Sequence, residues 1–445
     1  MQKPSVTTDH LDALQLMEFD ACTRCGECLK WCPVYDVIKS GAFSPNGNGS
    51  GLIDGYTPRD KVGDWKQFMN AGYGLRAKLF SPQKIPESVI QDFSERLYHC
   101  AACGVCGSVC PAGINTTGLW DSLRSNLVNR GNGPLQSQEF FTEVISKYKN
   151  PYRADQRNRL HWLPDDIEVS ESAEVAYFVG CTVEYKTPLH AVSVVRILKK
   201  FDIPFTMLGE DELCCCADLI SIGHRDTENI ARDFARRNIE QLLERGVKKV
   251  LFSCPGCYQV AVDEWPRYYG DKLPFECVHA SQFVFELLDK ERRWTNRIDK
   301  TVTYHDPCHL GRQMGIYEPP RDAIKRLPGV NFVEMERNRE FQRCCGAGGN
   351  ALREGVPELT GAIAKMRVQD AVDVGAELLV TSCPCCFLTL SGGNGNGNGK
   401  GGSNGDGNGS SSSSSSSSGG NGDGDDAGVV VEDLATLCAR SLGLI

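Results

Sequence analysis

The sequence has no long apolar run and no dense cluster of basic residues. Among its 445 residues, no stretch approaches the roughly 18 apolar residues that a membrane-spanning helix requires. The N-terminal stretch MQKPSVTTDHLDALQ lacks the basic start and apolar core of a secretory signal peptide. The net charge is -9, so the electrostatic footprint of a nucleic-acid-binding protein is also missing. We therefore expect a cytoplasmic protein that binds no nucleic acid and reaches a membrane only through a partner.

Sequence signatures of nucleotide cofactors are absent as well. The stretch GNGNGK at residues 395–400 lacks the spacing of a P-loop and the Ser or Thr that follows its lysine. GAGGNALREG at 346–355 is rich in glycine, but no clear strand precedes it, as a dinucleotide-binding fingerprint requires. Any flavin or nicotinamide would therefore have to be bound by another subunit.

Cysteine, in contrast, is abundant, with 22 residues in the chain. Without an export signal these thiols are expected in a reducing compartment, where clustered cysteines more often serve metal or redox chemistry than disulfide bonding. Two runs, CTRCGECLKWCP and CAACGVCGSVCP, share the spacing C-x2-C-x2-C-x3-C-P. This is the spacing of bacterial ferredoxins that hold two 4Fe–4S clusters, and soft thiolates suit iron–sulfur clusters or zinc.

In this spacing the fourth cysteine of each run ligates the other cluster. The runs therefore predict two cubane clusters with crossed ligands: Cys22, Cys25, Cys28 and Cys110 for one, and Cys100, Cys103, Cys106 and Cys32 for the other. The alternative is a pair of zinc knuckles, which usually show two C-x2-C pairs and seldom three cysteines followed by C-P. We expect a mainly α-helical ferredoxin domain over residues 1–150.

The chain from about residue 171 onward contains a repeat. VAYFVGCT matches VTYHDPCH, and VKKVLFSCPGC matches AELLVTSCPCC, while ELCCCADL and QRCCGAGG fall between the members of each pair. The separation between matching cysteines is nearly constant along the chain, which indicates a duplicated unit. We predict a first unit over 171–300 and a second unit over 301–445, with a flexible low-complexity loop over 391–428 inserted in the second.

Within each unit, β-rich segments alternate with helix-like segments, which favours an α/β fold with a parallel sheet. Ligands gather at the carboxyl ends of the strands in such sheets, and several cysteines follow the predicted strands directly. The sequence thus places a first cysteine set, Cys181, Cys214, Cys215, Cys254 and Cys257, and a second cysteine set, Cys308, Cys344, Cys345, Cys383 and Cys386. Five thiolates are one more than a cubane or a tetrahedral zinc ion needs.

The duplicated pattern C-x(n)-C-C-G-x(n)-C-x2-C resembles the cysteine-rich CCG domain of heterodisulfide reductases. With the N-terminal ferredoxin domain, the chain is similar to the D subunit of membrane-bound heterodisulfide reductase, and closer still to DsrK, its counterpart in the membrane complex linked to dissimilatory sulfite reductase. The stretches ACTRCGECLKWCPVYD, HDPCHLGRQMGIYEPPR and RCCGAGG carry that match. The resemblance implies a noncubane 4Fe–4S cluster, held by five cysteines, in one or both units.

The resemblance also implies a function. Quinol-derived electrons would arrive through a membrane cytochrome b partner, pass the two cubanes and reduce a disulfide or trisulfide, in relatives of the DsrK type that of a DsrC-type sulfur-carrier protein. The second cysteine set is the expected catalytic one, because its CCG is intact and HDPCHLGR and GAGG surround it. His305 and Arg312, near Cys308 in sequence, are candidates for proton delivery or for binding an anionic substrate group.

The sequence departs from the family pattern in both units. Cys216 stands where the family has glycine, and Cys385 adds a thiol to CPCC. Two other interpretations remain open at this point. The same ferredoxin and CCG architecture resembles the iron–sulfur subunits of glycolate, lactate and glycerol-3-phosphate dehydrogenases, in which the chain would relay electrons for a flavoprotein. A purely structural zinc protein is the third interpretation.

Overall fold

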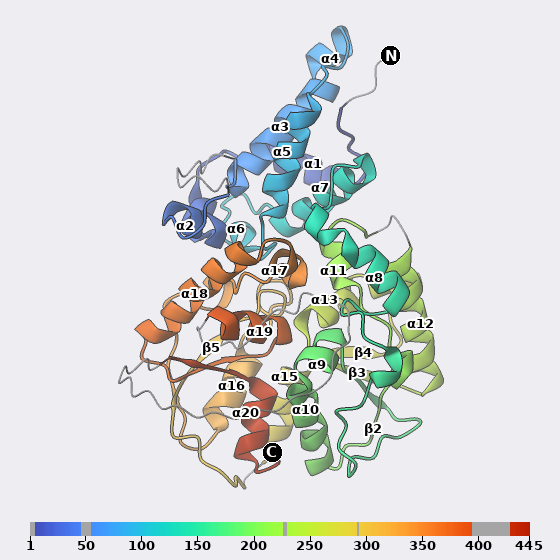
Figure 1. The fold of residues 1–445 in the computed structure, drawn as a ribbon, viewed down its shortest axis with the longest axis vertical. Helices are drawn as coiled ribbons and strands as arrows, with labels where there is room; N and C mark the ends of the chain where they lie inside the picture. The colour runs from blue at the N-terminus through green and yellow to red at the C-terminus, as the bar shows by residue number, and fades with distance from the viewer. Residues whose placement is uncertain (1–4, 46–54, 226–228, 292, 394–427) are drawn as a thin grey trace, which may run out of the picture.

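A computed structural model describes residues 5–45, 55–225, 229–291, 293–393 and 428–445. An N-terminal helical part lies at one end of the molecule, and two α/β units lie side by side beneath it (Figure 1). The helices of the N-terminal part are α1 (Ala13–Ala21), α2 (Pro33–Lys39), α3 (Pro58–Tyr73), α4 (Leu75–Leu79), α5 (Glu87–Tyr98), α6 (Val105–Ser108), α7 (Thr116–Arg130) and α8 (Phe140–Tyr148). None of the helices in the described ranges is long and apolar enough to cross a bilayer.

The two cysteine runs of the N-terminal part lie in short connections between its helices. Cys22 directly follows α1, and Cys32 is the residue that precedes α2, whose first residue is a proline. Gly26 and Gly104 occupy matching places in the two runs and both adopt a left-handed conformation, with φ of 84° and 77°. Glycine adopts this conformation without a steric penalty, so each run can fold tightly around a cluster.

Each α/β unit contains a four-stranded parallel sheet, and the two sheets have the same strand order. The first sheet runs β2 (Phe205–Thr206), β1 (Val175–Phe178), β3 (Lys249–Phe252) and β4 (Glu276–His279). The second runs β6 (Asn331–Phe332), β5 (Thr301–His305), β7 (Leu378–Thr381) and β8 (Val430–Asp433). Val175 pairs with Lys249 in the first sheet, and Val302 pairs with Leu378 in the second. The predicted fold class, with a helical domain followed by two parallel α/β units, is confirmed.

The helices of the two units follow the strands as the apolar periodicity predicts. They are α9 (Cys181–Lys186), α10 (Pro188–Lys200), α11 (Ala217–Ser221), α12 (Ile230–Glu244), α13 (Pro255–Asp263), α14 (Trp265–Tyr269), α15 (Ala280–Leu288), α16 (Glu318–Arg326), α17 (Ala351–Gly355), α18 (Pro357–Asp373), α19 (Pro384–Gly393) and α20 (Leu434–Ser441). The helix α19 continues to Gly393, so the first residues of the predicted loop 391–428 are helical. Residues 394–427 of that loop lie outside the described ranges.

The two units share one hydrophobic core. Helices α10 and α15 of the first unit pack against α16 and α20 of the second, between the two sheets. Tyr177 of β1 and Tyr304 of β5 are both fully buried in this core. The helix α8 of the N-terminal part also contributes Phe141 and Ile145 to a core of the first unit. The parts are therefore closely packed together, and the boundaries at 150, 171 and 301 stay predictions.

Candidate functional site

In the N-terminal part, the second run of cysteines lies next to the last cysteine of the first run. Burial raises the pKa of the Cys32 thiol, and the neighbouring Cys100, Cys106 and Cys103 raise it further. Burial likewise raises the pKa of Cys28 to about 12, and Cys32, Cys22 and Cys25 contribute to this rise. The placement of Cys32 agrees with the crossed ligand pattern, which stays a prediction.

Three further cysteines of the two runs lie beside the hydrophobic core of the N-terminal part. Cys22, Cys100 and Cys110 are half-buried and pack against a cluster built around Trp65 and Trp120. Cys25 is exposed at the surface of the first run, whereas Cys103 and Cys106 are buried. Apart from Cys32, the cysteines of the first run are therefore more exposed than Cys103 and Cys106 of the second run.

In both α/β units the predicted cysteines lie at the carboxyl ends of the central strands. Cys181 begins α9 shortly after β1, and Cys254 precedes α13 shortly after β3. Cys308 follows β5, and Cys383 precedes α19 shortly after β7. Short loops carry the Cys-Cys doublets to the same edge, since the side chain of Cys214 contacts that of Cys181.

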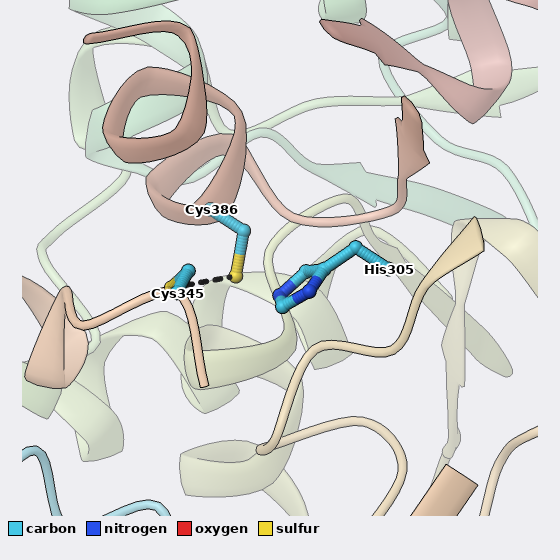
Figure 2. A group of neighbouring side chains, drawn as sticks. All are labelled: His305, Cys345 and Cys386. Carbon is cyan, nitrogen blue, oxygen red and sulfur yellow. Dashed lines mark hydrogen bonds between the residues drawn. The ribbon is translucent and has the colours of Figure 1, made fainter. Parts of the chain in front are cut away.

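The sulfur contacts follow the same path in the two sets. In the first set, close side-chain contacts link Cys181 to Cys214, Cys214 to Cys215, Cys215 to Cys257, and Cys254 to Cys257. In the second set they link Cys308 to Cys344, Cys344 to Cys345, Cys345 to Cys386, and Cys383 to Cys386. The distance from Cys345 Sγ to Cys386 Sγ is 3.3 Å (Figure 2).

Backbone N–H groups point at several of these sulfurs, which suits thiolate ligands. The N–H of Gly346 donates to Cys344 Sγ over 3.3 Å, and the N–H of Cys216 donates to Cys214 Sγ over the same distance. The N–H of Cys386 donates to Cys383 Sγ over 3.4 Å. Closely spaced, buried thiols with such donors fit a metal cluster, which keeps coordinating sulfurs deprotonated.

The two cysteine sets face one another across a single cavity of about 270 Å³. Every cysteine of both sets lines this cavity, together with Ala102 from the second ferredoxin run. Residues of both units and of the N-terminal part therefore form the wall of the same cavity.

The N-terminal part contacts the second set directly. A side-chain hydrogen bond with Cys344 is the largest cause of a raised pKa at Cys103, and burial adds to it. Arg312 holds the same junction together: its Nε donates to the Cys103 carbonyl over 2.7 Å, and its Nη1 donates to the Gln342 carbonyl over 2.7 Å. This contact places Cys103, a predicted ligand of the N-terminal clusters, next to the second set.

The sequence suggested a substrate or proton role for Arg312 and His305. Arg312 bonds main-chain carbonyls and does not line the cavity, so its position favours joining the two parts of the chain. His305 ends β5, is fully buried, and also does not line the cavity. Its ring points toward the sulfurs of Cys345 and Cys386 (Figure 2), and the ligand-type atoms of the three side chains lie within 4.8 Å of one another. The catalytic roles of both residues stay predictions.

Two contacts at the cysteine sets were not predicted from the sequence. Cys385 of the second unit reaches the first set, with a side-chain hydrogen bond to Cys254 and its sulfur 3.8 Å from Thr182 Oγ1. Arg159 donates to Cys181 Sγ over 3.4 Å while it pairs with Glu212 over 2.6 Å. The additional cysteine in CPCC was visible in the sequence, but nothing in the sequence shows which unit its side chain enters.

Comparison with known protein families supports a ferredoxin-like N-terminal part followed by two cysteine-rich units. Residues 18–114 match the 4Fe-4S dicluster domain family, and residues 175–260 and 302–391 each match the cysteine-rich domain family. The dicluster match confirms two 4Fe–4S clusters in the N-terminal part, and the donor sets of the two units fit noncubane clusters.

The chain is 47% identical over 391 residues, 88% of its length and 92% of the relative, to the D subunit of dihydromethanophenazine:CoB–CoM heterodisulfide reductase from Methanosarcina acetivorans. It is 43% identical over 442 residues, 99% of its length and 98% of the relative, to the same protein of Methanosarcina barkeri. A more distant relative, 28% identical over 85% of this chain, is EtfAB:quinone oxidoreductase of Syntrophomonas wolfei, of which this chain spans 55%. With its dicluster domain and duplicated cysteine-rich domain, the chain is an iron–sulfur oxidoreductase subunit that belongs to the family of heterodisulfide reductase D subunits.

Proposed function

We propose that this chain reduces a disulfide in the cavity between its two cysteine sets, with electrons delivered through the N-terminal clusters. The observation that carries this proposal is that both sets and the ferredoxin residue Ala102 line one cavity. The contact between Cys103 and Cys344 gives electrons a short path to that cavity. The names of the Methanosarcina relatives, which include the CoB–CoM heterodisulfide, point to the same reaction class.

The reaction is a two-electron reduction: one S–S bond breaks, and two electrons and two protons convert the disulfide into two thiols. When bound, iron–sulfur clusters supply electrons one at a time. His309 lines the cavity and lies between Gly256 of the first unit and Gly349 of the second, so it is placed to deliver a proton. Gly348 and Gly349 also line the cavity, and their lack of side chains leaves room for a substrate.

The charges around the cavity favour a protein disulfide over an anionic coenzyme disulfide. Among the described residues that line it, Asp121, Asp218, Asp263 and Glu264 have carboxyl groups. Arg225 also lines the cavity, and its guanidinium forms ion pairs with Glu264 at 3.0 Å and with Asp121 at 3.4 Å. A polyanionic ligand would meet repulsion here, whereas the arm of a DsrC-type sulfur-carrier protein would meet hydrogen-bond acceptors.

The chain would act within a membrane-associated complex. The relatives are named as subunits, so partner subunits are part of the proposal. A membrane cytochrome b subunit would pass quinol-derived electrons to the exposed first run around Cys25, and the chain would remain cytoplasmic and peripheral to the inner membrane.

The second candidate is an electron relay for a flavoprotein such as a glycolate, lactate or glycerol-3-phosphate dehydrogenase. The likeness to EtfAB:quinone oxidoreductase favours it, because that relative is named for electron transfer to quinone and not for disulfide reduction. In this case the cavity would bind no disulfide.

The two functions are separated by one anaerobic experiment on the purified full chain. We expect about 16 irons per chain, from four clusters of four, and a paramagnetic signal in the oxidised protein that changes when a DsrC-type carrier or a dithiol is added. About 8 irons would restrict the clusters to the N-terminal part. A full iron content with no spectral response to any thiol would contradict the disulfide proposal and favour the relay.

A further inference from the structure

The protonation of His305 is determined by its neighbour Arg367. Both side chains are completely buried, and Arg367 Nε donates to His305 Nδ1 over 3.1 Å. A guanidinium has donors only, so Nδ1 must be the acceptor. An imidazole whose Nδ1 accepts a hydrogen bond carries its single proton on Nε2, so the ring is the neutral Nε2–H tautomer.

The proton on Nε2 has no oxygen or nitrogen partner. His305 Nε2 is one of the buried polar atoms without a hydrogen-bond partner among the described residues. The ring faces the second cysteine set, and the sulfurs of Cys345 and Cys386 are the atoms toward which it points (Figure 2). A buried donor without a partner is costly, so this N–H is positioned for an acceptor at the cysteine site.

Proximity to two cysteines would also suit a histidine ligand, since His305, Cys345 and Cys386 could hold a metal ion by distance alone. The bond from Arg367 argues against that role, because a ring nitrogen that carries a proton has no lone pair for a metal. Arg367 is itself held by Asp370, over 3.2 Å from Nη1, and by the Arg337 carbonyl, over 2.9 Å. The guanidinium is therefore fixed in the orientation that determines the tautomer.

We propose that His305 is a positioning and tuning residue that donates its Nε2–H to the sulfur of Cys345 and does not ligate iron. An N–H donor to a cluster sulfur stabilises the added negative charge of the reduced state, so it raises the reduction potential of the cluster bound there. The second set, which contacts Cys103, would thereby accept electrons from the N-terminal clusters more readily. This inference rests on the proposed function only in placing a redox-active cluster at the second set.

The first unit has no such donor at the matching position. Phe178 ends β1 as His305 ends β5. Its ring packs against Phe252 and Trp265, with ring centroids 5.3 Å and 5.7 Å away. The inferred tuning is therefore specific to the second set, and Phe178 offers a matched control.

The first test needs no variant. Pulsed EPR of the wild-type holoprotein, with ¹⁵N-labelled histidine and after exchange into D₂O, should show a weak nitrogen coupling and an exchangeable proton near one cluster. A strong nitrogen coupling, as expected for an iron–nitrogen bond, would overturn the tautomer assignment. The absence of any histidine coupling would overturn the contact.

The second test compares variants by EPR-monitored redox titration of the full chain. His305→Phe should shift the midpoint potential of one noncubane signal to a more negative value, and His305→Gln, which keeps a donor, should shift it less. Phe178→Leu should leave that potential unchanged. If His305→Phe loads its iron and keeps the wild-type potential, the proposal is wrong. Should His305→Phe fail to load iron, His305→Gln and the wild-type spectra decide the outcome.

These readouts do not depend on disulfide turnover, so a protein without reductase activity would count against the proposed function alone.

Discussion

The two α/β units have kept the same cysteines and changed the residues around them. Strand order and the path of sulfur contacts are the same in both units. The residue after the doublet differs, as does the last residue of the first central strand: Cys216 and Phe178 in the first unit, Gly346 and His305 in the second. Duplication thus preserved the cysteines, while hydrogen bonding and packing around each set diverged. The reduction potential of a cluster depends on those surroundings, so two copies of one site can perform different steps.

The contact with the N-terminal part adds to this asymmetry. Cys103 and Arg312 join the ferredoxin domain to the second unit at Cys344 and Gln342. The first set instead receives a thiol from the second unit, Cys385, beside Cys254. In the proposed function, the contact between Cys103 and Cys344 would let electrons enter the pair of sites at the second set.

Removing one cysteine from either doublet should have the largest effect. Cys345→Ala and Cys215→Ala should each lose about 4 of about 16 irons, because each doublet cysteine contacts two others of its set. Disulfide reduction should fall by at least about 100-fold in both variants if the substrate needs both sites. Iron analysis and anaerobic turnover measure the two effects.

Cys277 provides the matched control for these variants, since it is half-buried on β4 and belongs to neither set. Cys277→Ala should keep its iron and its turnover. If Cys215→Ala loses iron but keeps full turnover, the first set is structural and the two-site proposal is wrong.

Substitution of a buried arginine near each cysteine set should distinguish an effect on protein stability from an effect on the cluster spectrum. Arg159 pairs with Glu212 and also donates to Cys181. Arg321 forms a bidentate pair with Asp306, at 2.5 Å and 2.8 Å, and its other hydrogen bonds go to Tyr317 and Glu334. Replacing either arginine by methionine leaves a buried carboxylate without its partner, which costs about 3–5 kcal/mol. We expect lower thermal midpoints for both holoproteins at a fixed scan rate, but a changed cluster spectrum only for Arg159→Met.

The exposed pair of Arg297 and Asp299, 3.0 Å apart, serves as the control for that comparison. Arg297→Met should change stability by less than about 1 kcal/mol, as is usual for surface ion pairs. An equal change of cluster spectrum in Arg159→Met and Arg321→Met would show that the contact with Cys181 has no specific effect.

The local chemistry of the sites could be predicted from the sequence, and their assembly could not. Cys181, Cys254, Cys308 and Cys383 lie at the carboxyl ends of parallel strands because alternating strands and helices force that arrangement. The bond from Arg159 to Cys181, the contact of Cys103 with Cys344, and the entry of Cys385 into the first site join residues that lie in different elements or units. Periodicity and motif spacing describe one element at a time, so they do not determine how two finished units pack against each other.

Substitution of the residue after each Cys-Cys doublet by alanine should have the smallest effect on stability. The effect should differ clearly between the two units. Gly346 has φ of 91°, and a Cβ placed there would lie 3.0 Å from the Thr360 carbonyl oxygen and 3.0 Å from Ile363 Cβ. Gly346→Ala therefore combines backbone strain with overpacking and should cost about 2–3 kcal/mol. Cys216 also adopts a left-handed conformation, with φ of 64°, but its side chain is already accommodated in the core.

Because that space exists in the first unit, Cys216→Ala should change stability by only about 1 kcal/mol, the effect of removing one buried sulfur. Thermal midpoints of the two holoproteins, with iron content measured beside them, give the comparison. Equal destabilisation by the two alanines would mean that the glycine of the second unit is not required by packing. A smaller destabilisation by Gly346→Ala than by Cys216→Ala would contradict the argument. It would mean that the first unit, and not the second, is the more sensitive to a substitution directly after the doublet.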